Sequence, residues 1–284
     1  MMLNNLLFQF AITEGAINRA TTVHFPVVTL SSPGAIVFQI GSLSVRWYGI
    51  LMAVAFLICY YLAEKLIVRN DLDLNHFGNL IFLVLIFSIV FARLYFVLLN
   101  WEYFQNHLDE IPKIWYGGQS IHGGILGCIL AAYLYSKASK ISFYKYIDVI
   151  VVMAPLGQAI GRWGNFFNNE AFGKPIHSGL LKLYIPKEFR PDAYIHNDYF
   201  HPTFLYESIL DLAIFIYLFK MFPQWKNEPG KTFWVYLLCY SVVRFLVEFL
   251  RTDSIYFYGV FSYAHVVSIL LILISSFALI WRRV

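Results

Sequence analysis

Seven long apolar segments constrain the fold of this chain more than any other feature. They run at about 43–62, 78–99, 120–136, 147–163, 203–222, 232–250 and 262–281. Each is close to the roughly 20 residues that a helix needs to cross about 30 Å of hydrocarbon. Charged residues are only 13% of the sequence, compared with roughly 25% in soluble domains. We therefore predict an all-α integral membrane protein with about seven transmembrane helices.

The basic residues of the short loops predict the orientation of these helices. With the N-terminus outside, the inner loops and the C-terminal end hold Lys65, Arg69, Lys137, Lys140, Lys145, Lys220, Lys226, Lys231, Arg282 and Arg283. The short outer loops hold only Lys113 and Arg251. Because short inner loops carry the excess of Lys and Arg, the predicted orientation is N-out and C-in.

Two segments lie outside the predicted helices. We divide the chain into an N-terminal arm, residues 1–42, and a seven-helix membrane domain, residues 43–284, with a small head at 164–202. The apolar run at 6–12 in the arm is too short to span a bilayer and lacks a preceding cationic region. We therefore expect an interfacial arm rather than a cleaved signal peptide. The head has four prolines and scattered charges and is expected outside the membrane.

The densest set of polar groups begins where the apolar run at 147–160 stops. The sequence from Gly161 to Gly173 is GRWGNFFNNEAFG, and its polar side chains include Arg162, Asn165, Asn168 and Glu170. We expect a helix to end near Arg162, which places its guanidinium to bind an anion. Gly164 and Gly173 would allow tight turns and the close approach of a ligand. The alternative is an interfacial loop that only caps the helix.

Ionisable residues of different helices are predicted to gather toward one side of the membrane. They are Arg46, Arg93, His122, Arg162, Glu207, Asp211, Arg244, Glu248 and Arg251. Such residues are costly inside a bilayer and by default indicate a functional site. Arg244, Glu248 and Arg251 are spaced i, i+4 and i+7, which predicts one shared helix face. A purely structural ion-pair network is the alternative.

Glu207 and Asp211 are also spaced i, i+4, and for this pair we favour a structural role. One of these two carboxylates is expected to pair with Arg93 or Arg46 and so hold helices together.

Arginines at this depth suit a phosphate, because the planar guanidinium binds it in a bidentate manner. A phospholipid is the obvious ligand at headgroup depth. His122, in the glycine-rich turn Ser120–Gly124, has a reference pKa of about 6.5 that suits proton transfer.

The net charge of +4 comes without a basic tract, which argues against nucleic acid. The sequence has no metal-ligand spacing and the three cysteines lie in apolar runs, so we predict no metal and no cofactor.

The stretch at 161–173 closely resembles the signature of the bacterial prolipoprotein diacylglyceryl transferases, roughly GRxGNFxNxExxG. Other stretches resemble the same family in order, at 45–49 (VRWYG), 121–124 (IHGG), 201–207 (HPTFLYE) and 244–251 (RFLVEFLR). The resemblance covers about residues 33–283. Asn169 stands where the family commonly has Gly, which is a mild departure.

The resemblance implies transfer of the diacylglyceryl group of phosphatidylglycerol to the lipobox cysteine thiol of a prolipoprotein signal peptide, leaving glycerol 1-phosphate. It implies a bacterial inner-membrane protein whose active site faces the periplasmic leaflet, with the head in the periplasm. We expect Arg162 and Arg244 to hold the phosphate and His122 to take the thiol proton. The expected substrate-binding residues are Tyr48, Asn165, Asn168, Glu170, Gly173, Tyr240, Glu248 and Arg251, with Glu248 positioning Arg244.

Two other functions are consistent with an anion site in a membrane protein. A transporter or flippase of an anionic lipid would bind and release its ligand without chemistry, and predicts polar groups through the full depth of the helices. A phospholipid phosphotransferase would direct attack to phosphorus instead of carbon. Identification of the released product distinguishes the phosphotransferase from the diacylglyceryl transferase.

Overall fold

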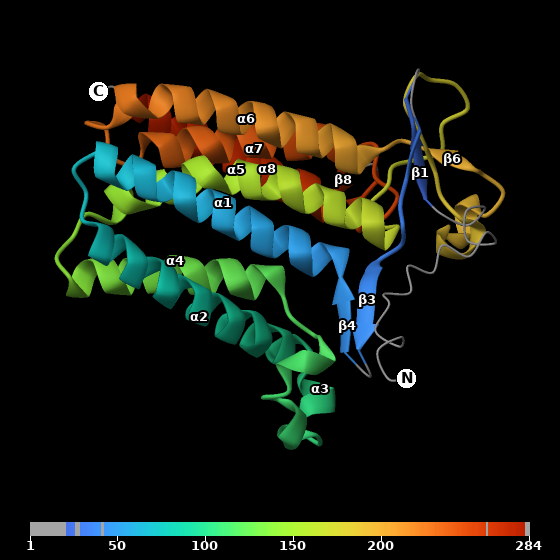
Figure 1. Ribbon diagram of the computed structural model, residues 1–284, viewed down its shortest axis with the longest axis horizontal. Helices are drawn as coiled ribbons and strands as arrows, with labels where there is room; N and C mark the ends of the chain where they lie inside the picture. Colours follow the sequence, from blue (N-terminus) through green and yellow to red (C-terminus); the bar gives the residue numbers. More distant parts are fainter. Residues whose placement is uncertain (1–20, 26–28, 41–42, 260, 282–284) are drawn as a thin grey trace, which may run out of the picture. The chain divides into compact units, whose positions relative to one another are not determined.

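The computed structural model describes residues 21–25, 29–40, 43–259 and 261–281, and most of these residues are helical (Figure 1). The long helices are α1 (Trp47–Arg69), α2 (Leu74–Leu99), α4 (Ile121–Ala138), α5 (Phe143–Asn168), α6 (Thr203–Trp225), α7 (Lys231–Glu248) and α8 (Tyr263–Trp281). Each overlaps one of the apolar segments of the sequence. By length and composition, α1, α2, α5 and α8 are able to cross a membrane. The chain is therefore a mostly helical membrane protein, and a crossing by all seven helices stays a prediction.

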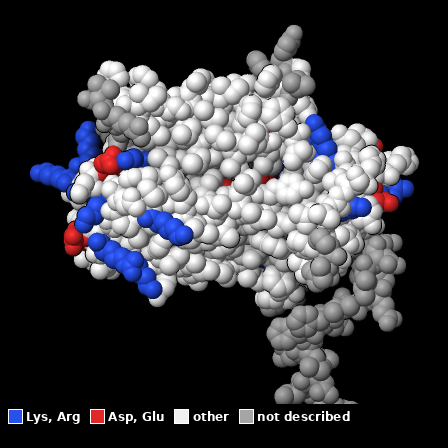
Figure 2. Space-filling view, turned by 90° about the horizontal axis from the view of Figure 1, so that it is seen from above, with Lys and Arg blue, Asp and Glu red and all other residues white. Residues whose placement is uncertain are grey.

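Large apolar side chains cover much of the surface of these helices. On α8, Leu273, Phe277 and Ile280 are each exposed over 60% or more of their area. On the face shown in Figure 2, uncharged side chains cover most of the surface, and the Lys and Arg side chains lie in a few groups. A soluble monomer rarely exposes so much contiguous apolar surface, whereas a bilayer favours it.

The described chain divides into two compact units. The first unit contains residues up to 61, 151–222 and 231–284, and the second contains 62–150 and 223–230. In the second unit α2 packs against α4 through glycines. A Cβ on Gly123 would lie 2.4 Å from the carbonyl oxygen of Phe91, and one on Gly127 would lie 2.4 Å from that of Phe87. Small residues four apart thus allow the two backbones to approach closely.

A short segment of the second unit connects α2 to α4. It contains helix α3 (Trp101–Phe104) and the single turns η2 (Leu108–Glu110) and η3 (Ile114–Tyr116).

The head in the first unit is built around a four-stranded antiparallel sheet of order β2-β1-β5-β6. Its strands are β1 (Thr22–His24), β2 (Thr29–Ser31), β5 (Lys182–Tyr184) and β6 (Tyr199–Phe200). Val23, Leu183 and Phe200 of this sheet form one buried cluster with Phe166 and Phe204 of the flanking helices. Two of the four strands come from the predicted arm, so part of residues 1–42 belongs to the head sheet. Residues 1–20, 26–28 and 41–42 of the arm lie outside the described residues.

Two hairpins lead the chain into helices of the first unit. Strands β3 (Ile36–Ile40) and β4 (Leu43–Arg46) pair antiparallel immediately before α1. Strands β7 (Tyr256–Tyr258) and β8 (Phe261–Ser262) pair antiparallel immediately before α8. Turns η4 (Lys187–Phe189) and η5 (Asp192–Tyr194) lie between β5 and β6. Together these pieces supply the loops around the candidate site.

Helix α5 does not end near Arg162 as the end of the apolar run predicted. It continues to Asn168, and the chain then turns through Asn169 at φ 58°. This left-handed residue just after a helix is the position that glycine favours, and asparagine is the usual substitute. The departure at Asn169 from the family's common glycine therefore keeps the same helix end. Gly164 lies within the helix, so it makes no turn.

Candidate active site

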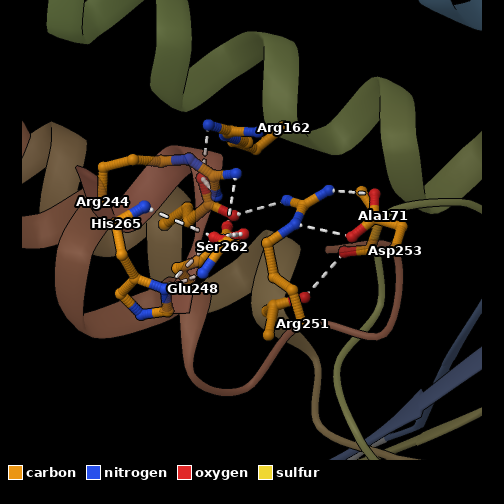
Figure 3. Close-up of polar contacts among 10 residues, drawn as sticks. Arg162, Ala171, Arg244, Glu248, Arg251, Asp253, Ser262 and His265 are labelled. Carbon is orange, nitrogen blue, oxygen red and sulfur yellow. Dashed lines mark hydrogen bonds and ion pairs between the residues drawn. The ribbon is translucent and has the colours of Figure 1, made fainter. Parts of the chain in front are cut away.

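Three arginines of the first unit converge on one buried carboxylate, Glu207 of α6. An Nη2 of Arg162 forms a direct ion pair with Oε2 of Glu207. Nη1 of Arg251 donates to Oε1 at 3.1 Å, and Nη1 of Arg244 lies 4.0 Å from Oε2. Glu207 is only 2% exposed. Figure 3 shows the guanidinium groups of Arg162, Arg244 and Arg251 turned toward one centre. We call these three arginines and Glu207, with the carboxylates that pair with them, the arginine cluster.

The remaining carboxylates of the arginine cluster are Glu248 and Asp211. Oε2 of Glu248 lies 2.7 Å from Nη2 of Arg244, the ion pair that the i, i+4 spacing predicts. Asp211, one turn along α6 from Glu207, has an Oδ2 4.0 Å from Nε of Arg162. Neither oxygen of Asp211 has a hydrogen-bond partner among the described residues. The cluster therefore balances three guanidinium groups with the buried carboxylates Glu207, Asp211 and Glu248.

The three arginines differ in the donors that they leave available. Arg251 is 9% exposed, while Arg162 and Arg244 are 20% and 23% exposed. Nε and Nη2 of Arg251 bind both oxygens of Asp253 at 2.8 and 2.5 Å, in addition to the bond to Glu207. Nη1 of Arg244 finds no hydrogen-bond acceptor among the described residues. Arg162 and Arg244 are thus the two cations able to take a ligand, and Arg251 is occupied by the protein.

Arg251 does not continue the face of α7, because that helix ends at Glu248. The shared i, i+4, i+7 face predicted for it is wrong, and a turn brings it to Glu207 instead. Its backbone forms an antiparallel bridge with Gly173, and N–H of Lys174 donates to the carbonyl of Leu250 at 2.6 Å. Thr252 Oγ1 donates to the carbonyl of Phe172 at 3.0 Å. The chain after α5 is thereby joined to the chain after α7.

Burial raises the pKa of Asp253, but its hydrogen bond and ion pair with Arg251 outweigh burial. The pKa of this carboxyl group therefore lies below its usual value.

Arg93 of α2 is not part of the arginine cluster. Its guanidinium donates to the carbonyl oxygens of Ile111, Gly117, Gly118 and Glu110 at 2.7 to 2.9 Å. The pairing of Glu207 or Asp211 with Arg93 or Arg46 that we predicted is wrong, because Arg162 and Arg251 take that place. Arg93 instead fastens the segment between α2 and α4 onto its own helix.

The polar residues after Arg162 bind one another. Nδ2 of Asn165 and Nδ2 of Asn168 both donate to Oε1 of Glu170, at 3.0 and 3.1 Å. The N–H of Glu170 donates to the carbonyl of Asn165 at 3.0 Å. These contacts satisfy groups at the end of α5 and fix the loop that follows it. Gly173 is needed because a Cβ there would lie 2.7 Å from Cβ of His201. The close approach at Gly173 is made by the protein chain itself.

An open pocket of about 550 Å³ lies at the start of α1. It is lined by Ser44, Val45, Arg46, Tyr48, Gly49, Ile50, Ala53 and Asn168. The ring of Tyr48 lies over Gly164, where a Cβ would come within 2.2 Å of Cδ2. Gly164 therefore provides close packing for Tyr48. This pocket brings Tyr48 and Asn168 together beside a cation, Arg46.

A smaller pocket of about 320 Å³ touches the arginine cluster through Glu248. It is lined by Lys174, Glu248, Phe249, Tyr256, Gly259 and His265. Ser262 Oγ donates to Oε1 of Glu248 at 2.6 Å, and its own N–H donates to Nδ1 of His265 at 3.1 Å. Sequence reasoning did not select Lys174, Ser262 or His265. The pocket brings together residues from 174 to 265, so spacing along the chain gives no signal for it.

A family model and two curated relatives identify the family to which this chain is similar. The model of the prolipoprotein diacylglyceryl transferase family matches residues 35–281. The chain is 44% identical over 254 residues to the phosphatidylglycerol--prolipoprotein diacylglyceryl transferase of Acaryochloris marina, covering 88% of this chain and 91% of that relative. It is 42% identical over 250 residues to the protein of the same name from Staphylococcus aureus strain MSSA476, covering 88% and 89%. The chain belongs to the prolipoprotein diacylglyceryl transferase family.

Two further residues that the family signature suggested occupy different units. Tyr240 of α7 lies one turn before Arg244 and stacks on Tyr236 with ring centroids 5.9 Å apart. His122 lies in the first turn of α4, exposed, with its ring 6.4 Å from that of Tyr95. Because His122 belongs to the second unit, its role in a transferase of this family stays a prediction. The arginine cluster, Tyr240 and both pockets belong to the first unit.

Proposed function

We propose that this protein transfers the diacylglyceryl group of phosphatidylglycerol to the cysteine thiol of a prolipoprotein. Two observations support the proposal. The chain is a member of a transferase family whose curated relatives carry both substrates in their name. The arginine cluster offers two partly exposed guanidinium groups, those of Arg162 and Arg244, that share one carboxylate, and Nη1 of Arg244 has no acceptor among the described residues. The second observation supports the roles that we propose for Arg162 and Arg244.

The proposed reaction is a substitution at carbon. The sulfur of the thiolate attacks the glyceryl carbon that bears the phosphate ester, so a C–S bond forms as the C–O bond breaks. The electron pair of that bond leaves with the phosphate, and glycerol 1-phosphate is released. The thiol proton passes to a base, for which we propose His122. A thiol with a pKa of about 8.5 is mostly protonated at neutral pH, so this proton must be removed.

Arg162 and Arg244 would stabilise the phosphate as its charge grows. Glu207 and Glu248 hold the two guanidinium groups in place before the lipid arrives, so little reorganisation is needed during the reaction. Each guanidinium has five N–H donors, and its carboxylate partner uses only some of them. Arg251, which binds Asp253 and Glu207, would support Glu207 instead of contacting the lipid.

The remaining predicted residues would orient the substrates. Tyr48 and Asn168 line the pocket at the start of α1, where part of the lipid can lie. Tyr240 stands one turn from Arg244, and Glu170 with Asn165 fixes the loop after α5. We propose that the seven helices all cross the inner membrane in the N-out, C-in orientation. The arginine cluster would then face the periplasmic leaflet, where both substrates are presented.

The proposal is tested by incubating the purified protein with phosphatidylglycerol and a lipobox peptide. The expected products are a diacylglyceryl thioether on the Cys peptide and free glycerol 1-phosphate, in equal amounts. A peptide with Ser in place of Cys is expected to react far more slowly, because an alcohol is a much weaker nucleophile at neutral pH. Equal turnover of the Ser peptide would contradict a thiol-specific transferase. A phosphatidylated peptide would instead identify a phosphotransferase, and vesicle-to-vesicle lipid movement without product would identify a flippase.

A further inference from the structure

The smaller pocket is a second polar site, and apart from Glu248 its residues have no role in the reaction described above. Its walls come from four segments: the loop after α5, the end of α7, the β7–β8 hairpin and the first turn of α8. Glu248 and His265 are 3% and 1% exposed, whereas Lys174 and Tyr256 are exposed at the surface. Glu248 also pairs with Arg244. A ligand held by Arg244 therefore lies next to a residue of this pocket.

The hydrogen bonds of His265 determine which ring nitrogen carries its proton. The N–H of Ser262 donates to Nδ1 at 3.1 Å, so Nδ1 is an acceptor. The hydroxyl proton of Ser262 is directed to Glu248, because the Oγ–Oε1 distance is 2.6 Å. Nδ1 is thus unprotonated and the neutral ring carries its proton on Nε2. Figure 3 shows the ring of His265 with its Nδ1 edge toward Ser262.

The Nε2–H of His265 is a buried donor that has no partner among the described residues. Buried polar groups are almost always hydrogen-bonded, so an unpaired one calls for an explanation. Three phenylalanine rings pack around the imidazole, with the centroid of Phe249 at 4.3 Å. Since His265 also lines the pocket, a ligand with an acceptor oxygen can supply the missing partner.

The charges of the pocket select the kind of ligand. Lys174 is an ammonium at the mouth, and Glu248 is a carboxylate at the floor. Glu248 would repel a second anion, and Lys174 would repel a cationic group. A neutral group with hydroxyls suits both, because each hydroxyl can accept from Lys174 or His265 and donate to Glu248. The cavity volume of about 320 Å³ is at the lower end of the range for small-molecule sites.

We propose that this pocket binds the terminal glycerol of phosphatidylglycerol and selects this lipid by its two hydroxyls. The proposal rests on the proposed function, in which the phosphate lies on Arg162 and Arg244. The terminal glycerol is attached to that phosphate and extends past Arg244 to Glu248 and His265. The same pocket then holds the leaving group, since glycerol 1-phosphate contains this glycerol.

A headgroup series tests the pocket in the wild-type protein. We compare kcat/KM for transfer to the Cys peptide from phosphatidylglycerol, phosphatidylethanol and phosphatidylethanolamine, with identical acyl chains. Phosphatidylethanol keeps the phosphate but has no hydroxyl, so its kcat/KM is expected to fall by on the order of 100-fold or more. Equal use of phosphatidylglycerol and phosphatidylethanol would overturn the pocket while leaving the transferase intact. Failure of every lipid to modify the peptide would instead overturn the proposed function.

Two substitutions of His265 separate ligand binding from a structural role. The amide nitrogen of Gln reaches the position of Nε2, so His265→Gln is expected to keep the preference for phosphatidylglycerol. The amide oxygen of Asn can accept from the Ser262 N–H, but Asn offers nothing at Nε2. His265→Asn is therefore expected to lower kcat/KM about tenfold or more for phosphatidylglycerol, with little change for phosphatidylethanol. The reverse order, or equal losses with both lipids, would show that His265 only supports the fold and would overturn the proposal.

Lys174 gives an independent test of the charge argument. Lys174→Glu is expected to raise the use of phosphatidylethanolamine relative to phosphatidylglycerol, because the ammonium headgroup no longer meets a cation. Lys182→Met is the matched control, since Lys182 belongs to β5 of the same head and lies over the ring of Tyr199 at 5.6 Å. The control is expected to leave the lipid preference unchanged. An unchanged preference in Lys174→Glu would contradict selection by charge.

Discussion

The arginine cluster and Arg93 show two outcomes for the same residue type placed in an apolar helix. Arg93 donates four hydrogen bonds to backbone carbonyls of one connecting segment. Arg162 and Arg244 instead meet carboxylate side chains of α6 and α7. Arg93 is 6% exposed and uses nearly all of its donors, whereas Arg162 and Arg244 are 20% and 23% exposed and Nη1 of Arg244 has no acceptor among the described residues. The comparison teaches that the kind of partner, more than depth in the helix, separates a structural arginine from an arginine that we propose binds a ligand.

The contacts of Arg93 and of Glu207 also differ in the number of chain segments that they hold together. The carbonyls bound by Arg93 belong to residues 110–118, so this arginine orders a single loop. Glu207 is contacted by arginines of α5, of α7 and of the turn after α7. One carboxylate therefore fixes the relative position of three segments. We use the contrast between Arg93 and the arginine cluster to frame four predictions, taken from the largest expected effect to the smallest.

Substitution of Arg162 is expected to have the largest effect, and on catalysis. Arg162→Lys keeps the charge but loses the planar fork, so kcat for transfer to the Cys peptide should fall by on the order of 100- to 1000-fold. Initial rates of glycerol 1-phosphate release measure this kcat, and a thermal melt verifies that the variant is folded. Arg93→Lys is the matched comparison and should retain activity per folded molecule. Full activity of Arg162→Lys would remove the distinction between the two regions.

Substitution of Arg93 is expected to act on stability instead. Arg93→Met leaves the carbonyls of Ile111 and Gly117, among others, without their donor. Each buried acceptor left unpaired costs about 1–3 kcal/mol unless water replaces the donor. The free energy of unfolding in detergent should therefore fall by about 2–4 kcal/mol. A drop in kcat without loss of stability would mean that Arg93 acts in the reaction.

Two glycines extend the comparison to packing. Gly127→Ala places a Cβ 2.4 Å from the backbone oxygen of Phe87, and Gly164→Ala places one 2.2 Å from the ring of Tyr48. Both substitutions overpack a helix contact, at a cost of about 1–3 kcal/mol of unfolding free energy. Only Gly164→Ala is expected to raise KM for the lipid, because it displaces Tyr48 from its pocket. An equal rise in KM for Gly127→Ala would contradict this division of roles.

The smallest expected effect is the pH dependence contributed by Asp253. Its folded-state pKa lies below the usual carboxyl value because of Arg251. The stabilisation is therefore complete above the unfolded pKa of about 4 and is lost as pH falls through the lower, folded value. Since the side chain of Asp253 is 52% exposed, solvent screening limits the contribution to below about 1 kcal/mol. Unfolding curves between about pH 2 and pH 6 should be flatter for Asp253→Asn, and an identical slope would contradict the ion pair.

Local spacing predicted local contacts and little beyond them. The i, i+4 relation placed Glu248 against Arg244 because one helical turn fixes that distance. The partners of Glu207 and Arg93 lie 17 to 45 residues away, so spacing carried no information about them. The seven apolar segments gave the positions of the helices, since each long helix overlaps one segment.

The sequence did not predict where α5 ends or that two strands lie within the arm. The apolar run stops near residue 160, yet α5 continues to Asn168, because its last turns use polar groups to build the site. Strands β1 and β2 are only three residues each, and β1 pairs both with β2 and with β5, about 160 residues further on. Short strands with remote partners leave too weak a pattern to detect in one sequence.

The hydrogen bonds between residues 172–174 and 250–252 bear on how a lipid would reach the arginines in the proposed reaction. They tie the segment after α5 to the turn after α7 through the Gly173–Arg251 bridge and the Lys174–Leu250 bond. Spreading α5 from α7 at that end would break these bonds together with the ion pairs on Glu207. These bonds oppose separation of the two segments, so for the proposed reaction we expect a lipid to reach the arginines by another route.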